Sequence, residues 1–205
     1  MARQTIRALE RTRADHIVSG SASCVARIAQ DYAHLFRDDP VWLPRAERLA
    51  RPVTDFPSFL EEVAKLPDGS LTAGPSALVP DGRVTYHDSC QGLNALDLAG
   101  EPRRLLADVM GFQVEELRES TLCCRFGGSF SFEYPEVAEQ LMDRKLDAAV
   151  RTGARVLVTD DQGCIMHFRD GVDAGKRPIR VVHIAELVAE RIHKVTCLMT
   201  VGIKT

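Results

Sequence analysis

The hydrophobic positions in the first part of the chain recur mostly with the spacing of helices. Four segments are predicted to be helices on this pattern: residues 4–12, 24–35, 43–49 and 54–66. Ser58 is the expected cap of the last of them. The short apolar run at residues 15–19 is typical of a buried strand instead, and a turn of glycine and small residues follows it. The first part of the chain is therefore predicted to surround one short strand with helices.

A stretch rich in proline, glycine and serine, residues 66–82, is predicted to be a linker. Beyond it, short apolar runs alternate with longer amphipathic segments. The predicted strands are residues 83–87, 113–117, 155–159 and 179–182, and the predicted helices are residues 102–110, 135–152 and 183–192. Strands that alternate with helices of about ten residues or more favour an α/β fold with mostly parallel sheets and flanking helices.

The composition excludes several classes of protein. The chain has 205 residues, of which 45% are hydrophobic and 27% charged, and its net charge is −3, so nucleic acid is not an expected partner. No segment approaches the apolar run of about 18 residues that spans a membrane, and the N-terminus does not resemble an export signal. The expected location is therefore the cytoplasm, where the six cysteines would be reduced thiols rather than disulfides.

Four of the cysteines follow predicted strands in the second part of the chain. Cys90 comes after the first of these strands, and the adjacent pair Cys123 and Cys124 comes after the second. Cys164 comes after the third. Because the carboxyl ends of parallel strands lie at one edge of a sheet, we expect the four thiols to converge there. A single free cysteine more often packs as a small buried residue, and this is what we expect of Cys24.

Thiolates bind soft or borderline metals, which leaves iron–sulfur clusters and Zn²⁺ as the alternatives. Two adjacent cysteines grip one zinc ion poorly but can bind different irons, so we favour an iron–sulfur cluster. In the following loop, Gly127 and Gly128 would let backbone N–H groups approach the cluster, and an ordinary turn is the alternative. His87, His167 and His183 are interpreted as packing, surface or capping residues, although the first and last lie at strand ends where they could face the cluster.

The sequence around these cysteines resembles the cysteine-rich "CCG" domain. The resemblance rests on Cys90, on the pair Cys123-Cys124 and on the turn Asp161-Gln162-Gly163-Cys164. That domain occurs in heterodisulfide reductase subunits and in iron–sulfur subunits of lactate and glycolate oxidation systems. The surrounding sequence is most similar to the lactate-utilisation type, at residues 85–90 (TYHDSC), 126–131 (FGGSFS), 152–154 (TGA) and 183–186 (HIAE).

The resemblance implies a fold of two related lobes and electron transfer within a multi-subunit oxidoreductase. It implies one [4Fe-4S] cluster, which is of a noncubane type in some family members. The partners would be flavin or iron–sulfur dehydrogenase subunits, which makes a hetero-oligomer the expected state. The implied metal ligands are Cys90, Cys123, Cys124 and Cys164.

The chain departs from the family pattern in three places. The first of two motif copies is reduced to Cys24, Arg125 replaces the usual glycine after the cysteine pair, and Asp161 replaces a fifth cysteine. Asp161 is therefore predicted as a fifth, harder ligand, or alternatively as the cap of a following helix. The predicted organisation is a truncated first lobe at residues 1–66, a linker at residues 67–82, a complete second lobe at residues 83–192 and a tail at residues 193–205.

We therefore predict an electron-transfer subunit for the oxidation of lactate or a similar 2-hydroxy acid, which is not itself the catalytic subunit. The sequence shows no dinucleotide-binding fingerprint and no convincing Ser–His–Asp order. Two alternatives stay open. One is a structural zinc-binding or metal-free interaction subunit, and the other is a thiol–disulfide reductase subunit of the heterodisulfide type.

Overall fold

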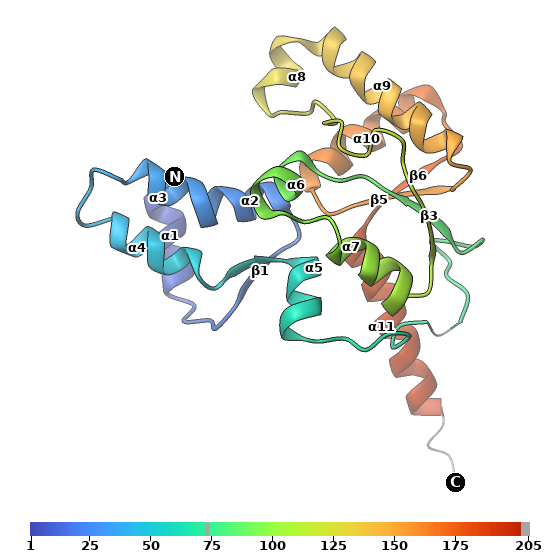
Figure 1. The fold of residues 1–205 in the computed structure, drawn as a ribbon, viewed down its shortest axis with the longest axis horizontal. Coiled ribbons are helices and arrows are strands. Elements are labelled where there is room, and N and C mark those ends of the chain that lie inside the picture. The colour runs from blue at the N-terminus through green and yellow to red at the C-terminus, as the bar shows by residue number, and fades with distance from the viewer. Residues whose placement is uncertain (73, 202–205) are drawn as a thin grey trace.

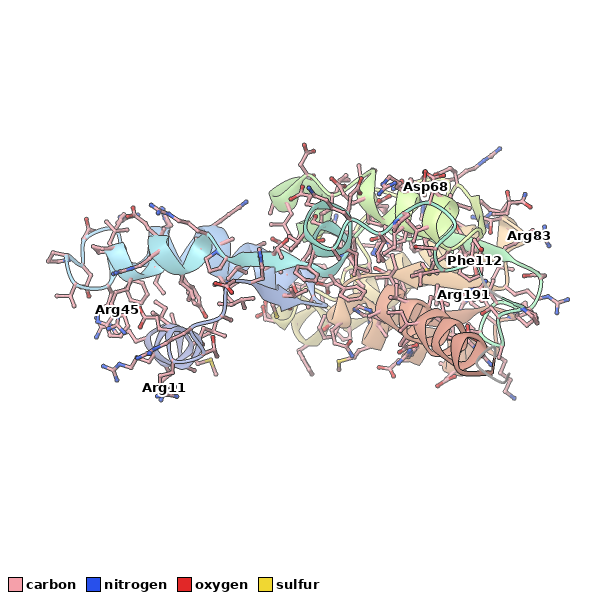
Figure 2. The ribbon with its side chains drawn as sticks, turned by 90° about the horizontal axis from the view of Figure 1, so that it is seen from below. Arg11, Arg45, Asp68, Arg83, Phe112 and Arg191 are labelled. Carbon is pink, nitrogen blue, oxygen red and sulfur yellow. The ribbon has the colours of Figure 1, made fainter. Side chains whose placement is uncertain are left out.

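The protein has a mixed α/β fold in which parallel sheets are flanked by helices, as predicted (Figure 1). The computed structural model describes residues 1–72 and 74–201, with side chains through Ile192. Two lobes lie along the long axis of the molecule, with Arg11 and Arg45 on the first lobe and Phe112 and Arg191 on the second (Figure 2). No helix in the described part of the chain is both long and apolar enough to span a membrane.

The first lobe is built on two short parallel strands, β1 (Ile17–Ser19) and β2 (Val53–Asp55). The connection between them is helical: α2 (Ala22–Ala26), a π-helical segment η1 (Arg27–Asp31), α3 (Tyr32–Leu35) and α4 (Leu43–Ala50). The N-terminal helix α1 (Ala2–Glu10) packs against α4. Apolar side chains from these helices, from β2 and from the turns between them form one core. Its buried members are Ile6, Val25, Tyr32, Phe36, Trp42, Ala46, Leu49 and Val53.

The prediction of one helix over residues 54–66 is wrong at its start. Strand β2 takes residues 53–55, and only then do α5 (Phe56–Ser58) and the π-helical segment η2 (Phe59–Val63) begin. The cap is Asp55 rather than Ser58, because the Asp55 carboxylate accepts a hydrogen bond from the Ser58 N–H at 2.8 Å. Pro57 in the first turn suits this start, since a proline there lacks only an N–H that would have no helical partner.

The second lobe contains a four-stranded, fully parallel sheet in the order β4-β3-β5-β6. Its strands are β3 (Arg83–Tyr86), β4 (Gln113–Glu115), β5 (Val156–Thr159) and β6 (Arg180–His183). Side chains alternate between the two faces, so that Val156 and Val158 enter one core and Leu157 enters the other. Both faces of β5 are buried, which explains its continuous apolar run.

Helices cover both faces of this sheet. One face carries α7 (Glu101–Arg104), the π-helical segment η3 (Leu105–Val109) and α11 (Ile184–Val201), and the other carries α9 (Pro135–Arg151) and α10 (Gln162–Gly175). The backbone of α11 continues through residue 201 of the predicted tail, while residues 202–205 lie outside the described residues. The segment at residues 66–82 contributes Leu71 and Val79 to the core that contains η3.

The order of the strands indicates that a binding site lies at the middle of the sheet. From β3 the chain moves outward to β4, and from β5 it moves outward on the opposite side to β6. Ligands in open parallel sheets bind beyond the carboxyl ends of the strands at the point where the order reverses. In this sheet that point lies beyond the neighbouring ends of β3 and β5.

Candidate metal centre

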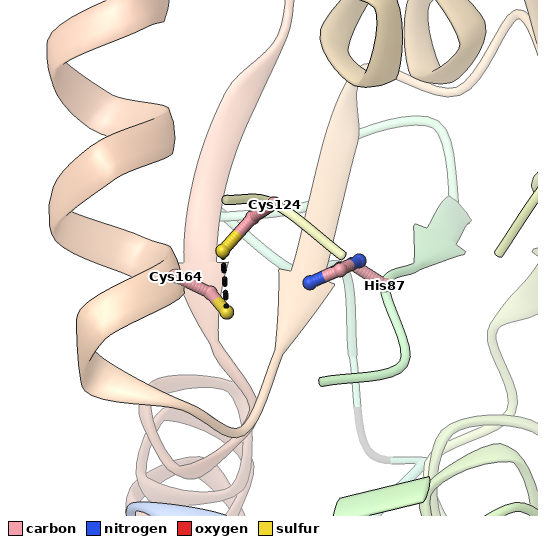
Figure 3. A group of neighbouring side chains, drawn as sticks. All are labelled: His87, Cys124 and Cys164. Carbon is pink, nitrogen blue, oxygen red and sulfur yellow. Dashed lines mark hydrogen bonds between the residues drawn. The ribbon is translucent and has the colours of Figure 1, made fainter. Parts of the chain in front are cut away.

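The structure brings the four predicted cysteines to this point. Cys90 is the first residue of a short helix, α6 (Cys90–Leu96), which Ser89 caps after β3. Cys164 lies in the first turn of α10 after β5, and Cys123 and Cys124 lie in the loop after β4. Cys124 and Cys164 are buried with their sulfur atoms 3.1 Å apart (Figure 3). All four residues line one cavity of about 440 Å³.

Both lobes contribute to the wall of this cavity. Ser23, Arg27 and Asp31 come from α2 and η1 of the first lobe. Gly127 and Gly128 line the second-lobe side at φ values of 54° and 59°, a left-handed conformation that favours glycine. A Cβ atom on Gly127 would also lie 2.9 Å from that of Phe130, so this turn requires glycine for two reasons.

The thiols interact with one another. The neighbouring thiols of Cys124 and Cys90 lower the pKa of Cys123, and the Arg125 N–H donates to its sulfur at 3.3 Å. The same contacts raise the pKa values of Cys90 and Cys124. The lowered pKa of Cys123 favours a thiolate at this position, so the site suits anionic sulfur.

A buried lysine, Lys145 of α9, holds the loop that carries the cysteine pair. Its ammonium group donates to the carbonyl oxygens of Glu119, Ser120 and Leu122 at 2.7, 2.6 and 2.8 Å. Burial lowers the pKa of Lys145 to about 8, while the nearby carboxylate and thiol groups oppose that change. The sequence analysis missed this residue, although its place on the apolar face of α9 beside Leu146 was a usable signal.

His87 is the second residue that the sequence analysis undervalued. It is fully buried at the end of β3, and its ring contacts Phe168 edge-on with centroids 4.9 Å apart. The ligand atoms of His87, Cys124 and Cys164 all lie within 4.8 Å of one another. Burial lowers the pKa of His87 to about 3, so its imidazole is neutral at ordinary pH.

The other two histidines have different surroundings. His183 accepts a hydrogen bond from the Ala185 N–H at 2.9 Å. Its other ring nitrogen forms a hydrogen bond with the carbonyl of Gly20, and this bond links the second lobe to the first. His167 lies half-buried on α10 with its ring against Phe126, outside the residues that line the cavity.

Asp161 lines the cavity, but its carboxylate is already engaged. One oxygen accepts from the N–H groups of Gly163 and Cys164 and caps α10, while the other accepts from the Ser23 N–H and the Ser21 hydroxyl of the first lobe. These four hydrogen bonds favour the capping alternative. A role for Asp161 as a metal ligand stays a prediction.

Replacing Asp161 with alanine tests the two roles. We expect the free energy of unfolding to fall by about 2–3 kcal/mol, because the helix cap and the bonds to the first lobe are lost, while bound iron is retained. Urea unfolding and iron analysis of the same preparation measure both effects. Asp170→Ala, at an exposed position of the same helix, is the control and should change stability by less than about 0.5 kcal/mol. Loss of iron from a stably folded Asp161→Ala protein would support the ligand role instead.

Cys24 does not match its prediction as a buried core residue. Helix α2 buries Ala22, Val25 and Ala26, and this phase turns Cys24 to the exposed side. Cys24 is also not among the residues that line the cavity. The sequence does not show which side of α2 Cys24 lies on, because a helix of five mostly small residues has no clear apolar face.

The second lobe contains a CCG-type domain. The family model described as "CCG: Cysteine-rich domain" matches residues 84–169, which run from β3 into α10 and include all four cavity cysteines. Over nearly the whole chain, the protein is 37% identical to lactate utilization protein A of Exiguobacterium sp., covering 93% of this chain and 74% of that protein. The proteins of the same name from Bacillus licheniformis and Bacillus thuringiensis are 35% and 36% identical, each covering 87% of this chain and 71% of theirs. The chain belongs to the lactate utilization protein A family, which confirms the resemblance inferred from the cysteine motifs.

Proposed function

We propose that this protein is an iron–sulfur subunit of a lactate-utilisation system and that it carries electrons for the oxidation of lactate or a similar 2-hydroxy acid. The observation that carries the proposal is the convergence of four cysteine thiols on one cavity at the middle of a parallel sheet. Cys90, Cys123, Cys124 and Cys164 would hold the cluster. A bound [4Fe-4S] cluster would supply one-electron redox chemistry at this position.

The surroundings of the thiols suit an anionic sulfur-rich group. Lys145 places a positive charge beneath the loop of Cys123 and Cys124, and the Arg125 N–H donates to the Cys123 sulfur. Hydrogen bonds to sulfur and nearby charge are two of the means by which proteins set the reduction potential of a cluster. Thiolates are also the donors that iron–sulfur clusters prefer.

The partners follow from this role as further proposals. We infer that the protein works in the cytoplasm within a hetero-oligomer, in which a flavin or iron–sulfur dehydrogenase subunit oxidises the substrate and exchanges electrons with this subunit. Residues 83–192 would form the complete CCG-type domain. Residues 1–66 would form a reduced first lobe that closes the cavity through Ser23, Arg27 and Asp31.

A zinc site is a second candidate, and one observation favours it. His87, Cys124 and Cys164 form a compact set of one nitrogen and two sulfur donors, which also suits tetrahedral Zn²⁺. The adjacent pair of cysteines argues for the cluster, because both of its thiols line the same cavity and one zinc ion binds an adjacent pair poorly.

Anaerobic purification followed by metal and sulfide analysis separates these candidates. We expect a brown protein with roughly four iron and four acid-labile sulfide per chain. Zinc without sulfide would replace the proposal with the structural role. Turnover of a disulfide substrate by the isolated brown protein would support the heterodisulfide-type alternative.

A further inference from the structure

The backbone fixes His87 in one place at the edge of the cavity. Its N–H donates to the carbonyl of Val158 at 2.9 Å and so extends the pairing of β3 with β5 by one residue. The edge-on contact with Phe168 fixes the plane of the ring. The ring is carried toward Cys124 and Cys164, with a nitrogen facing their sulfur atoms (Figure 3).

Neither ring nitrogen of His87 has a hydrogen-bond partner among the described residues. Buried polar atoms in folded proteins are almost always paired, and leaving one unpaired costs about 1–3 kcal/mol. A phenylalanine could fill an apolar position against Phe168 without this cost. The buried imidazole is therefore best explained by a group that binds to it within the site.

The neighbouring atoms indicate what that group is. The thiols of Cys124 and Cys164 lie within 4.8 Å of a His87 ring nitrogen, and both are themselves proposed to bind iron. A neutral imidazole offers one lone pair, and imidazole nitrogen is a good ligand for iron. The same cavity therefore presents nitrogen beside sulfur.

We propose that His87 is a nitrogen ligand of the iron–sulfur cluster, in a mixed donor set with the four cysteines. The inference rests on the proposed function, because it needs a cluster in the site. As a fifth ligand, a neutral imidazole leaves the site less negative by one charge than a thiolate at the same position would. The smaller negative charge raises the reduction potential of a cluster.

A weaker role for His87 would be donation of an N–H hydrogen bond to a cysteine sulfur. The two roles differ in how strongly the nitrogen couples to the electron spin of the cluster. A nitrogen bonded to iron gives a large hyperfine coupling, whereas a nitrogen that reaches sulfur through a hydrogen bond gives a small one. The measurement on the wild-type protein therefore separates the roles without any substitution.

The test is pulsed EPR of the anaerobically purified full-length protein in its paramagnetic state, with and without ¹⁵N-histidine labelling. We expect a large nitrogen coupling that changes on labelling. It should be absent from His87→Phe, with a loss of iron affinity of about tenfold or more. His87→Cys should retain iron at a lower reduction potential. In the control His167→Phe, which alters the half-buried histidine on α10, coupling and iron content should be unchanged.

Three results would overturn the inference: only a small coupling in the labelled wild type, an unchanged spectrum and potential in His87→Phe, or loss of the coupling in His167→Phe instead. If His87→Phe does not fold, loss of the histidine nitrogen coupling in His87→Cys decides instead. Wild-type protein without iron and sulfide would instead overturn the proposed function itself. The two failures are therefore distinguishable.

Discussion

Replacing Cys124 with serine is expected to lower the iron and sulfide content by roughly tenfold or more. Cys124 is buried, and its sulfur lies 3.1 Å from that of Cys164. A serine hydroxyl is a harder donor that stays protonated at neutral pH, so it replaces a thiolate poorly in iron–sulfide chemistry. Iron and acid-labile sulfide analysis of anaerobic preparations, together with the visible absorption spectrum, measures the loss.

Cys24→Ser is the matched control for this substitution. Cys24 is exposed on α2 and is not among the cavity residues, so the same chemical change should leave iron and sulfide at the wild-type level. Iron retained in full by Cys124→Ser would remove Cys124 from the set of ligands. Equal losses in the two variants would show that Cys24 also takes part in binding the cluster.

Lys145→Met should destabilise the cluster-free protein at least as much as Asp161→Ala does. Methionine fills a similar volume but cannot donate to the carbonyls of Glu119, Ser120 and Leu122. Hydrogen bonds from a charged group contribute about 1.5–3 kcal/mol each, so the expected loss is about 3 kcal/mol or more in the free energy of unfolding. For a domain of this size the melting temperature would fall by roughly 6–12 °C. Urea and thermal unfolding of the cluster-free protein give both values.

Lys65→Met is the control, because Lys65 is exposed and the change of side chain is the same. It should alter the free energy of unfolding by less than about 0.5 kcal/mol. If Lys145→Met also fell within that range, water would have to satisfy the three carbonyls. Lys145 would then have no role in holding the cysteine loop.

Much of the second lobe was predictable because its signals are local. The run Val156–Val158 is apolar at every position, as expected for a strand buried on both faces, and α9 repeats its apolar residues with helical spacing. The parallel arrangement then follows from the alternation of strands and helices. Once the strands are parallel, the convergence of Cys90 and Cys164 follows as well, since they come after neighbouring strands.

Features that depend on distant parts of the chain were not predictable in the same way. Strand β2 has three residues and exists because Val53 lies opposite Ile17, which no local pattern reveals. Lys145 shares the apolar face of α9, but its own helix does not show that carbonyls of a loop some 25 residues earlier surround it. The surroundings of the His87 ring depend on what two distant segments bring to it: the loop with Cys124, and α10 with Cys164 and Phe168.

The short distance between Cys124 and Cys164 has a consequence for the assembly of the protein. Two free thiols 3.1 Å apart need to approach by only about 1 Å to reach the bond length of a disulfide, ~2.05 Å. Dioxygen that accepts two electrons and two protons from this pair would close the site to metal. If the site binds a cluster as proposed, oxidation of this pair in air would compete with metal insertion. A reducing step should then restore the capacity to bind iron in protein that has lost it.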